Sequence, residues 1–217
     1  MKTKNIIASV AAKWTAIIIF LFSLGVFVLI THEVLLENED LFDSKVFAFL
    51  ESYSSPLLIQ FFKGITFFGS SSFLFPAWLI LIGLLSFSHS VKEAIEVALL
   101  AITSTLLTYG LKTLFVRHRP GMPLFKELTS YSFPSGHSLS SLVFCTTIIW
   151  LIWHSALQAK WKWLCSVLLL TFSFAIGISR IVLRYHYASD VLGGFSLGTA
   201  YILLFYGLKS WLRSHRN

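Results

Sequence analysis

The stretch WTAIIIFLFSLGVFVLIT, residues 14–31, determines the class of fold. It is 18 residues long and carries no charged side chain. At about 1.5 Å per residue, a helix of this length nearly crosses the roughly 30 Å hydrocarbon core of a bilayer. Lys13 interrupts the early apolar run, and no small-x-small cleavage pattern stands at the end of the stretch 14–31. We therefore expect an uncleaved membrane helix rather than a secretory signal.

The rest of the chain repeats this apolar pattern. Of the 217 residues, 56% are hydrophobic and 12% charged, and the mean hydropathy is +0.76. A soluble domain carries about 25% charged residues. We predict an all-α integral membrane bundle of six transmembrane helices, with an interfacial helix near 57–68. The single domain covers 1–217, with transmembrane segments at about 14–31, 73–88, 91–116, 138–153, 163–183 and 188–211.

The charges predict how the bundle is oriented in the cell membrane. Cytoplasmic loops carry an excess of Lys and Arg. With six crossings, one face collects Lys2, Lys4, Lys13, Lys92, Lys160, Lys162, Lys209, Arg213 and Arg216. Both termini are therefore expected in the cytoplasm. The connection between the first and second segments, which carries Glu33, Glu37, Glu39, Asp40, Asp43 and Glu51 against Lys45, is expected outside with 117–137 and 184–190. The net charge of +7 is spread over many loops and forms no patch for nucleic acid.

The first group of ionisable residues is KTLFVRHRP, residues 112–120. Lys112 and Arg119 are seven apart, so a helix would place both on one side. Pro120 predicts that this helix ends near Arg119. Cations at a membrane-helix end are equally typical of side chains that snorkel to the interface, and the pattern assigns no role to Arg117 or His118.

The second group is YSFPSGHS, residues 131–138, directly before an apolar run. Pro, Ser and Gly suit the start of a helix, where unpaired N–H groups and the positive end of the dipole attract anions. An ordinary N-cap at Ser138 and an interfacial His137 would explain the same residues.

The third group is SRIVLRYHYASD, residues 179–190. His186 and Asp190 are four apart, hence neighbours on one face of a helix. A carboxylate that accepts the Nδ1–H of the imidazole leaves Nε2 free to attack. Stabilisation of a helix dipole would explain Asp190, but it leaves His186 without a role.

Two further observations bear on metals and cofactors. Cys145 and Cys165 stand alone within apolar runs and are predicted to be packing residues. Glu127 and Asp190 are the carboxylates near the three groups, too few for the clusters that hold catalytic metal ions. We predict no metal and no cofactor.

Taken together, the three groups resemble the motifs of the type 2 phosphatidic acid phosphatase family, KxxxxxxRP, PSGH and SRxxxxxHxxxD. All three are intact, at 112–120, 134–137 and 179–190. The resemblance implies a nucleophile at His186, an orienting carboxylate at Asp190 and a general acid at His137. It implies phosphate binding by Lys112, Arg119, Ser135, Gly136 and Arg180.

The function expected from this resemblance is hydrolysis of a membrane lipid phosphate through a phosphohistidine. Cations around a helix N-terminus suit a transferring phosphoryl group, whose charge spreads over three oxygens. Undecaprenyl diphosphate, phosphatidylglycerophosphate and phosphatidic acid are the leading substrates, and the oligomeric state stays open. The alternatives are a lipid phosphotransferase, an enzyme like the vanadium haloperoxidases, and a non-enzymatic lipid transporter.

Overall fold

A computed structural model describes the chain except for residues 1, 37–40, 89–90, 122, 125–127 and 216–217. The described residues form eight helices and no strand. In chain order the helices are α1 (Lys2–Leu36), α2 (Leu41–Ser52), α3 (Pro56–Phe67), α4 (Ser71–Phe87), α5 (Val91–Phe115), α6 (Gly136–His154), α7 (Ala159–Val182) and α8 (Ala188–Ser214).

Six stretches of the described residues are long and apolar enough to cross a membrane, so the predicted all-α bundle of six transmembrane helices is confirmed. The second stretch, Pro56–Phe87, combines α3 and α4 and begins well before residue 73. Helix α2 was not predicted, because charged side chains interrupt its short apolar runs.

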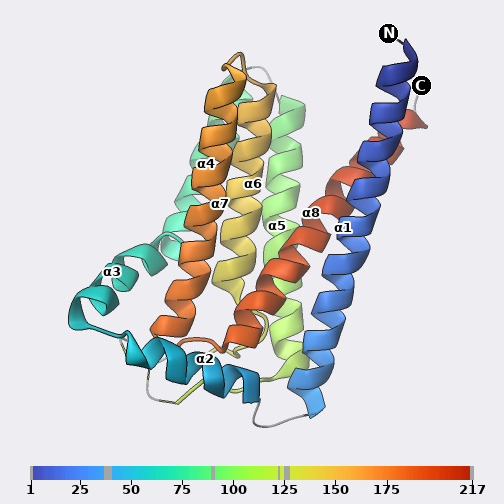
Figure 1. Ribbon diagram of the computed structural model, residues 1–217. Helices are drawn as coiled ribbons and strands as arrows, with labels where there is room; N and C mark the ends of the chain where they lie inside the picture. Colours follow the sequence, from blue (N-terminus) through green and yellow to red (C-terminus); the bar gives the residue numbers. More distant parts are fainter. Residues whose placement is uncertain (1, 37–40, 89–90, 122, 125–127, 216–217) are drawn as a thin grey trace.

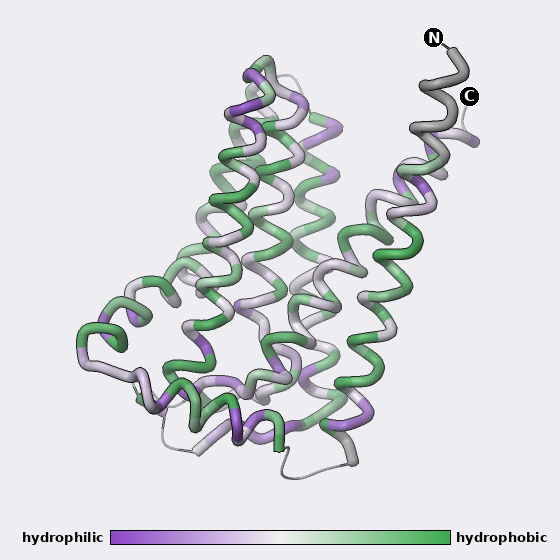
Figure 2. Tube along the Cα trace, viewed as in Figure 1, coloured by the Kyte–Doolittle hydropathy of each residue, from purple (hydrophilic) through white to green (hydrophobic). Residues whose placement is uncertain are grey.

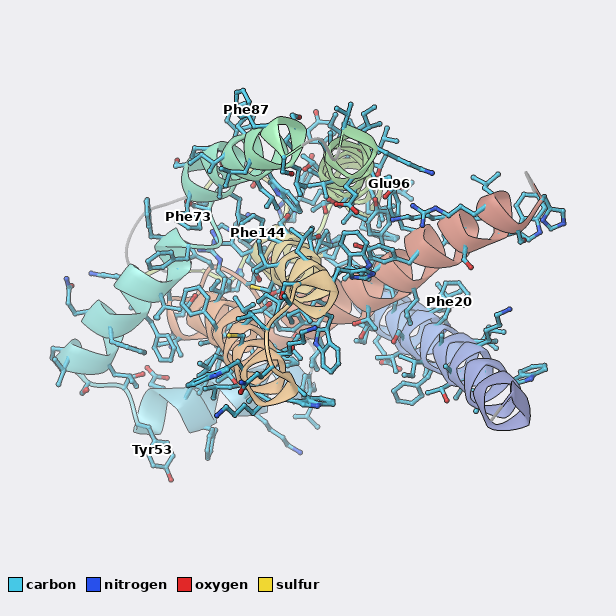
Figure 3. The ribbon with its side chains drawn as sticks, turned by 90° about the horizontal axis from the view of Figure 1, so that it is seen from above. Phe20, Tyr53, Phe73, Phe87, Glu96 and Phe144 are labelled. Atoms are coloured by element: carbon cyan, nitrogen blue, oxygen red, sulfur yellow. The ribbon has the colours of Figure 1, made fainter. Side chains whose placement is uncertain are left out.

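Helix α6 stands at the centre of the bundle, where it packs against α4, α5, α7 and α8 (Figure 3). Phe144 of α6 meets Trp78 of α4 edge-on, with 4.8 Å between ring centroids. Small residues bring α8 close to α6: a Cβ on Gly194 would lie 2.6 Å from the carbonyl oxygen of Ser135. Such close helix contacts are typical of membrane bundles.

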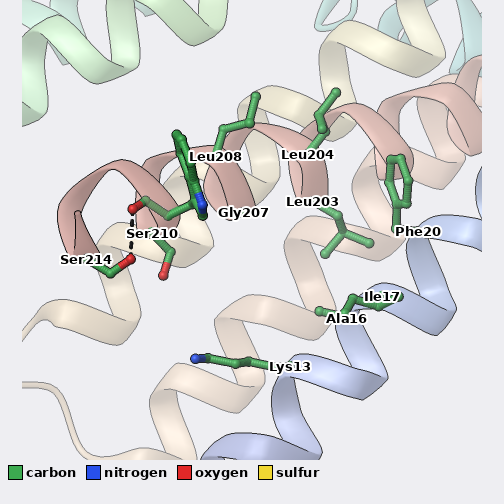
Figure 4. Close-up of a pocket in the computed structure, with 11 residues that line it drawn as sticks. Lys13, Ala16, Ile17, Phe20, Leu203, Leu204, Gly207, Leu208, Ser210 and Ser214 are labelled. Atoms are coloured by element: carbon green, nitrogen blue, oxygen red, sulfur yellow. Dashed lines mark hydrogen bonds between the residues drawn. The ribbon is translucent and has the colours of Figure 1, made fainter.

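Helices α1 and α8 pack on each other and lean away from the other helices at the end where the chain begins (Figure 1). At that end they line an open pocket of about 560 Å³, whose lining includes Lys13, Phe20 and Leu208 (Figure 4). The described parts of the α5–α6 connection, 116–121, 123–124 and 128–135, and the connection 183–187 meet at the other end of the bundle, where α2 lies (Figure 1).

The outer surfaces of the helices are apolar. Phe22 is 71% exposed, Leu57 82% and Phe87 86%, and hydrophobic residues run along the helices while hydrophilic ones gather near their ends (Figure 2). An apolar exterior of this extent requires lipid as its solvent. The protein is a multi-pass membrane protein.

Candidate active site

The end of α5 differs from the sequence prediction. The helix ends at Phe115, four residues before Arg119, because Val116 adopts a left-handed backbone with φ of 52°. The N–H of Val116 donates to the carbonyl of Lys112 at 3.1 Å. Lys112 and Arg119 therefore do not share a helix face, and a β-branched residue in this conformation is a genuine outlier.

The two cations nevertheless meet at the segment 130–132. Lys112 Nζ donates to the carbonyls of Tyr131 and Ser132, at 2.5 and 3.0 Å. Arg119 donates from Nε to the carbonyl of Ser130 at 2.7 Å, and its Nη1 lies 3.2 Å from His186 Nε2. The fold thus brings Arg119 to the predicted nucleophile.

The PSGH segment starts α6, as expected, but Ser135 rather than Ser138 is its N-cap. Ser135 Oγ accepts from the N–H of Ser138 at 3.4 Å, and the N–H of Ser135 donates to the carbonyl of Asp190 at 3.0 Å. A Cβ on Gly136 would lie 3.8 Å from Cε of Lys112, so that side chain passes the helix start. His137 lies in the first turn of α6, against Gly69 of the α3–α4 turn.

Arg180 is buried near the end of α7, with 2% of its surface exposed. Its Nη1 donates to Thr66 Oγ1 of α3 at 2.7 Å, and its guanidinium stacks on the ring of Tyr185 at 4.2 Å. Its Nε is buried and has no hydrogen-bond partner among the described residues. A buried donor without a partner is costly, so this atom is a natural site for an anion.

His186 and Asp190 form the predicted pair, although His186 precedes α8 instead of lying on it. His186 Nδ1 lies 3.3 Å from Asp190 Oδ2 and 3.2 Å from Ser132 Oγ. Ser132 Oγ also donates to Asp190 Oδ2, as does the N–H of Tyr187 at 2.9 Å. The start of α8 is a capping box, which aims the carboxylate back at the imidazole.

His186 is 1% exposed and its charge state follows from its surroundings. Burial, and then the positive charges of Lys112, Arg180 and Arg119, lower the pKa of His186 well below its usual range. The imidazole is therefore neutral near pH 7, which is the form that has a lone pair for attack.

The comparisons with known proteins agree on one family. A family model described as the PAP2 superfamily matches residues 93–214, which include all three motifs. The chain belongs to the PAP2 superfamily. Phosphatidylglycerophosphatase B of Bacillus subtilis (strain 168) is 34% identical over 157 residues, 72% of this chain and 76% of the relative.

Two solved structures are also similar to this PAP2 protein. One is the first transmembrane PAP2 type phosphatidylglycerolphosphate phosphatase from Bacillus subtilis, with a TM-score of 0.74, 30% identity, and 90% of this chain and 96% of that chain covered. The other is LpxE of Aquifex aeolicus, with a TM-score of 0.61, 25% identity, and 78% and 98% covered.

Sequence reasoning missed three side chains around Asp190 in this PAP2 protein. Arg117 Nη1 donates to Asp190 Oδ1 at 2.7 Å, and its Nη2 donates to Asp43 Oδ2 at 2.9 Å. Asp43 belongs to α2 and is 2% exposed, whereas Ser132 is fully buried beside His186. Arg117 was visible in the first motif, but no sequence signal paired it with Asp43 or marked Ser132.

Arg184 and Arg180 would be neighbours on one helix face if α7 continued to residue 184, but it does not. Helix α7 ends at Val182, and Arg184 has a left-handed φ of 55°. Its guanidinium pairs with Glu51 of α2 at 3.1 Å. Arg184 and Arg119 line one cavity of about 230 Å³, so the two cations still flank a common space. His118 is exposed.

No group of three or more His, Cys, Asp or Glu side chains that could hold a metal ion occurs among the described residues. Glu127 lies outside the described part of the PAP2 chain. Independence from metals stays a prediction.

Proposed function

We propose that this PAP2 protein hydrolyses membrane lipid phosphates and diphosphates through a phosphohistidine at His186. The observation that carries the proposal is the orientation of this imidazole. Asp190 lies at its Nδ1 side, and its Nε2 faces Arg119. The name of the Bacillus subtilis relative, phosphatidylglycerophosphatase B, supports hydrolysis of a lipid phosphate.

The phosphate would be bound by three cations and the start of α6. Lys112, Arg119 and Arg180 supply positive charge, and the unpartnered Nε of Arg180 gains an acceptor when an anion arrives. The backbone N–H groups that follow Ser135 lie at the N-terminus of α6, which is the positive end of the helix dipole. This set matches the charge that develops on the equatorial oxygens of a transferring phosphoryl group.

The reaction has two steps with His137 as the proton carrier. The Nε2 lone pair of His186 forms a bond to phosphorus while the bond to the lipid oxygen breaks, and His137 gives its proton to that oxygen. Water then attacks phosphorus, His137 takes a proton from it, and the N–P bond breaks with its electron pair returning to Nε2. Asp190 accepts the Nδ1–H throughout, and inorganic phosphate leaves.

We place the site on the extracytoplasmic face, with both termini in the cytoplasm. The acidic helix α2 covers the site end of the bundle, whereas Lys160, Lys162 and Arg213 lie toward the other end. Among the described residues, the Lys and Arg side chains that do not belong to the candidate site lie mostly at that other end, which fits the positive-inside bias. The lipid substrate would reach the site laterally from the bilayer.

Phosphatidylglycerophosphate, undecaprenyl diphosphate and phosphatidic acid are the substrates to compare. Arg184 supports a preference for diphosphates, because its guanidinium shares a cavity with Arg119 and suits the oxygens of a second phosphate. Arg184→Ala should then lower kcat/KM for undecaprenyl diphosphate relative to phosphatidic acid. An unchanged ratio would remove Arg184 from substrate selection.

The test of the function is release of free phosphate by the purified protein from these three lipids, with and without EDTA. Wild type should release phosphate in EDTA and be inhibited by orthovanadate, and labelled substrate should leave phosphate on His186. His186→Ala should be inactive, while His154→Ala, at the far end of α6, should be active. Lack of release by wild type refutes the proposal, and labelled phosphate on a second lipid would indicate a phosphotransferase. Bromide oxidation with vanadate, or lipid transfer without hydrolysis, would support the two remaining alternatives.

A further inference from the structure

An ionic chain runs from helix α2 to the carboxylate behind His186. Asp43 of α2, Arg117 of the α5–α6 connection and Asp190 of α8 follow one another with N–O distances of 2.9 and 2.7 Å. The side chains of the two carboxylates are 3% and 0% exposed, and that of Arg117 is 13% exposed. Charges so well shielded from water interact strongly with their partners.

The two oxygens of Asp190 have separate partners. Oδ2 receives Ser132 Oγ and the N–H of Tyr187 and faces His186 Nδ1. Oδ1 receives Arg117 Nη1. Arg117 binds Oδ1, the oxygen of Asp190 that does not face the imidazole. This contact restrains the rotation of the carboxylate group, and it therefore helps to fix the position of Oδ2 relative to His186.

The backbone conformation before Arg117 indicates that the contact between Arg117 and Asp190 is specific. Arg117 follows Val116, whose left-handed φ of 52° is strained for a β-branched residue. Arg117 comes directly after this turn, and its guanidinium also stacks on Tyr187 at 4.2 Å. A strained position that persists beside a reacting group is typical of functional sites.

A purely structural tie between α2 and the bundle is the simpler explanation, but that tie does not require Arg117. Asp43 Oδ1 already accepts the backbone N–H of Ser189 at 2.8 Å, and Oδ2 accepts Ser189 Oγ at 2.5 Å. Those two bonds join α2 directly to the first turn of α8. Arg117 Nη1 also donates to Ser189 Oγ at 2.7 Å, and it adds a contact to Asp190 that the two Asp43–Ser189 bonds do not use.

We propose that Arg117 is a positioning residue for His186, acting through Asp190, with Asp43 as its buried counter-ion. The inference rests on the proposed function, since it assigns Arg117 to the same reaction. Because its guanidinium pairs with two carboxylates, Arg117 is distinct from the cations predicted to bind phosphate. Its loss should slow the chemical step and leave substrate binding intact.

The experiment measures kcat and KM for phosphate release by Arg117→Gln, Arg117→Lys and wild type. Arg117→Gln should lower kcat on the order of 10²-fold, the effect of a misplaced reacting group, and leave KM within about threefold. Arg117→Lys keeps the charge and should recover at least about tenfold of that loss. The matched control is Arg213→Gln, whose side chain is 53% exposed and pairs with Glu96 at the other end of the bundle, and which should behave as wild type.

A double-mutant cycle tests the role of Asp43. If Asp43 acts through Arg117, Asp43→Asn should lower kcat by about three- to tenfold in wild type and have no further effect in Arg117→Gln. Multiplicative effects of the two substitutions would show that Asp43 acts by another route and would overturn that part of the inference.

Each remaining outcome has a defined meaning. A kcat of Arg117→Gln near that of wild type, or a rise in KM alone, overturns the inference while the proposed function stands. If Arg117→Gln does not elute as a single folded species in detergent, Arg117→Lys tests the inference instead. Its kcat should then be lower than that of wild type at unchanged KM, and an unchanged kcat would refute the inference. Absence of phosphate release by wild type would overturn both proposals.

Discussion

Ser132 gives a sharp test of how the His186–Asp190 pair is held. Its Oγ is fully buried, donates to Asp190 Oδ2 and lies 3.2 Å from His186 Nδ1. Ser132→Ala removes one oxygen and leaves the backbone carbonyl that accepts from Lys112 in place. The change therefore removes the hydrogen bond to the Asp190 carboxylate together with the contact to His186 Nδ1.

The size of the effect follows from that bond. A hydrogen bond to a charged group contributes about 1.5–3 kcal/mol. If Asp190 uses it to stabilise the imidazolium-like charge that builds on His186 during attack, its loss appears in the transition state. At 1.36 kcal/mol per tenfold in rate, kcat should fall by about 10- to 150-fold.

The assay is the initial rate of phosphate release in detergent micelles, with saturating substrate. Ser173→Ala is the matched control, because Ser173 is also fully buried and shares one neutral hydrogen bond of 3.0 Å with Ser141. The control should lose about 0.5–1.5 kcal/mol of stability and keep its kcat. A kcat of Ser132→Ala within twofold of wild type would refute the reasoning.

Three further predictions concern pH, packing and topology. The pKa of His186 is lowered in the folded protein, so the imidazole takes up a proton near pH 6.5 in the unfolded chain but not in the folded one. Falling pH should therefore destabilise wild type more than His186→Asn. The measurement is the Tm of both proteins between pH 7 and 5. Gly69→Ala should lower kcat and stability, since its Cβ would lie 2.8 Å from His137 Cδ2 and 2.5 Å from Ile176 Cγ2, whereas Gly64→Ala, with nothing within 4 Å, should be neutral on both measures. An impermeant thiol reagent on intact cells, in a protein without its native cysteines, should label a Cys at Lys126, which lies outside the described residues, and not one at Lys160; the reverse would place the site in the cytoplasm.

The sequence by itself determined the membrane class, the number of crossing helices and the family. A long uncharged run is stable in a bilayer as a helix, because a helix satisfies the hydrogen bonds of its backbone groups internally. The order and spacing of the three motifs identified the family, which the match over residues 93–214 confirms. The proximity of His186 to Asp190 was also predictable, because the two residues are only four apart in the sequence, although the structure places His186 before α8 and not on its face.

Only the tertiary structure decided what surrounds that pair. Arg117 and Asp43 are 74 residues apart, Ser132 and Asp190 are 58 apart, and Arg180 and Thr66 are 114 apart. No local periodicity connects such residues. The Arg117 contacts follow the left-handed turn at Val116, which ends α5 early, and the packing of α2, which brings buried Asp43 against the start of α8. Buried charges select their partners by proximity after the helices pack, because an unpaired one is too costly to leave.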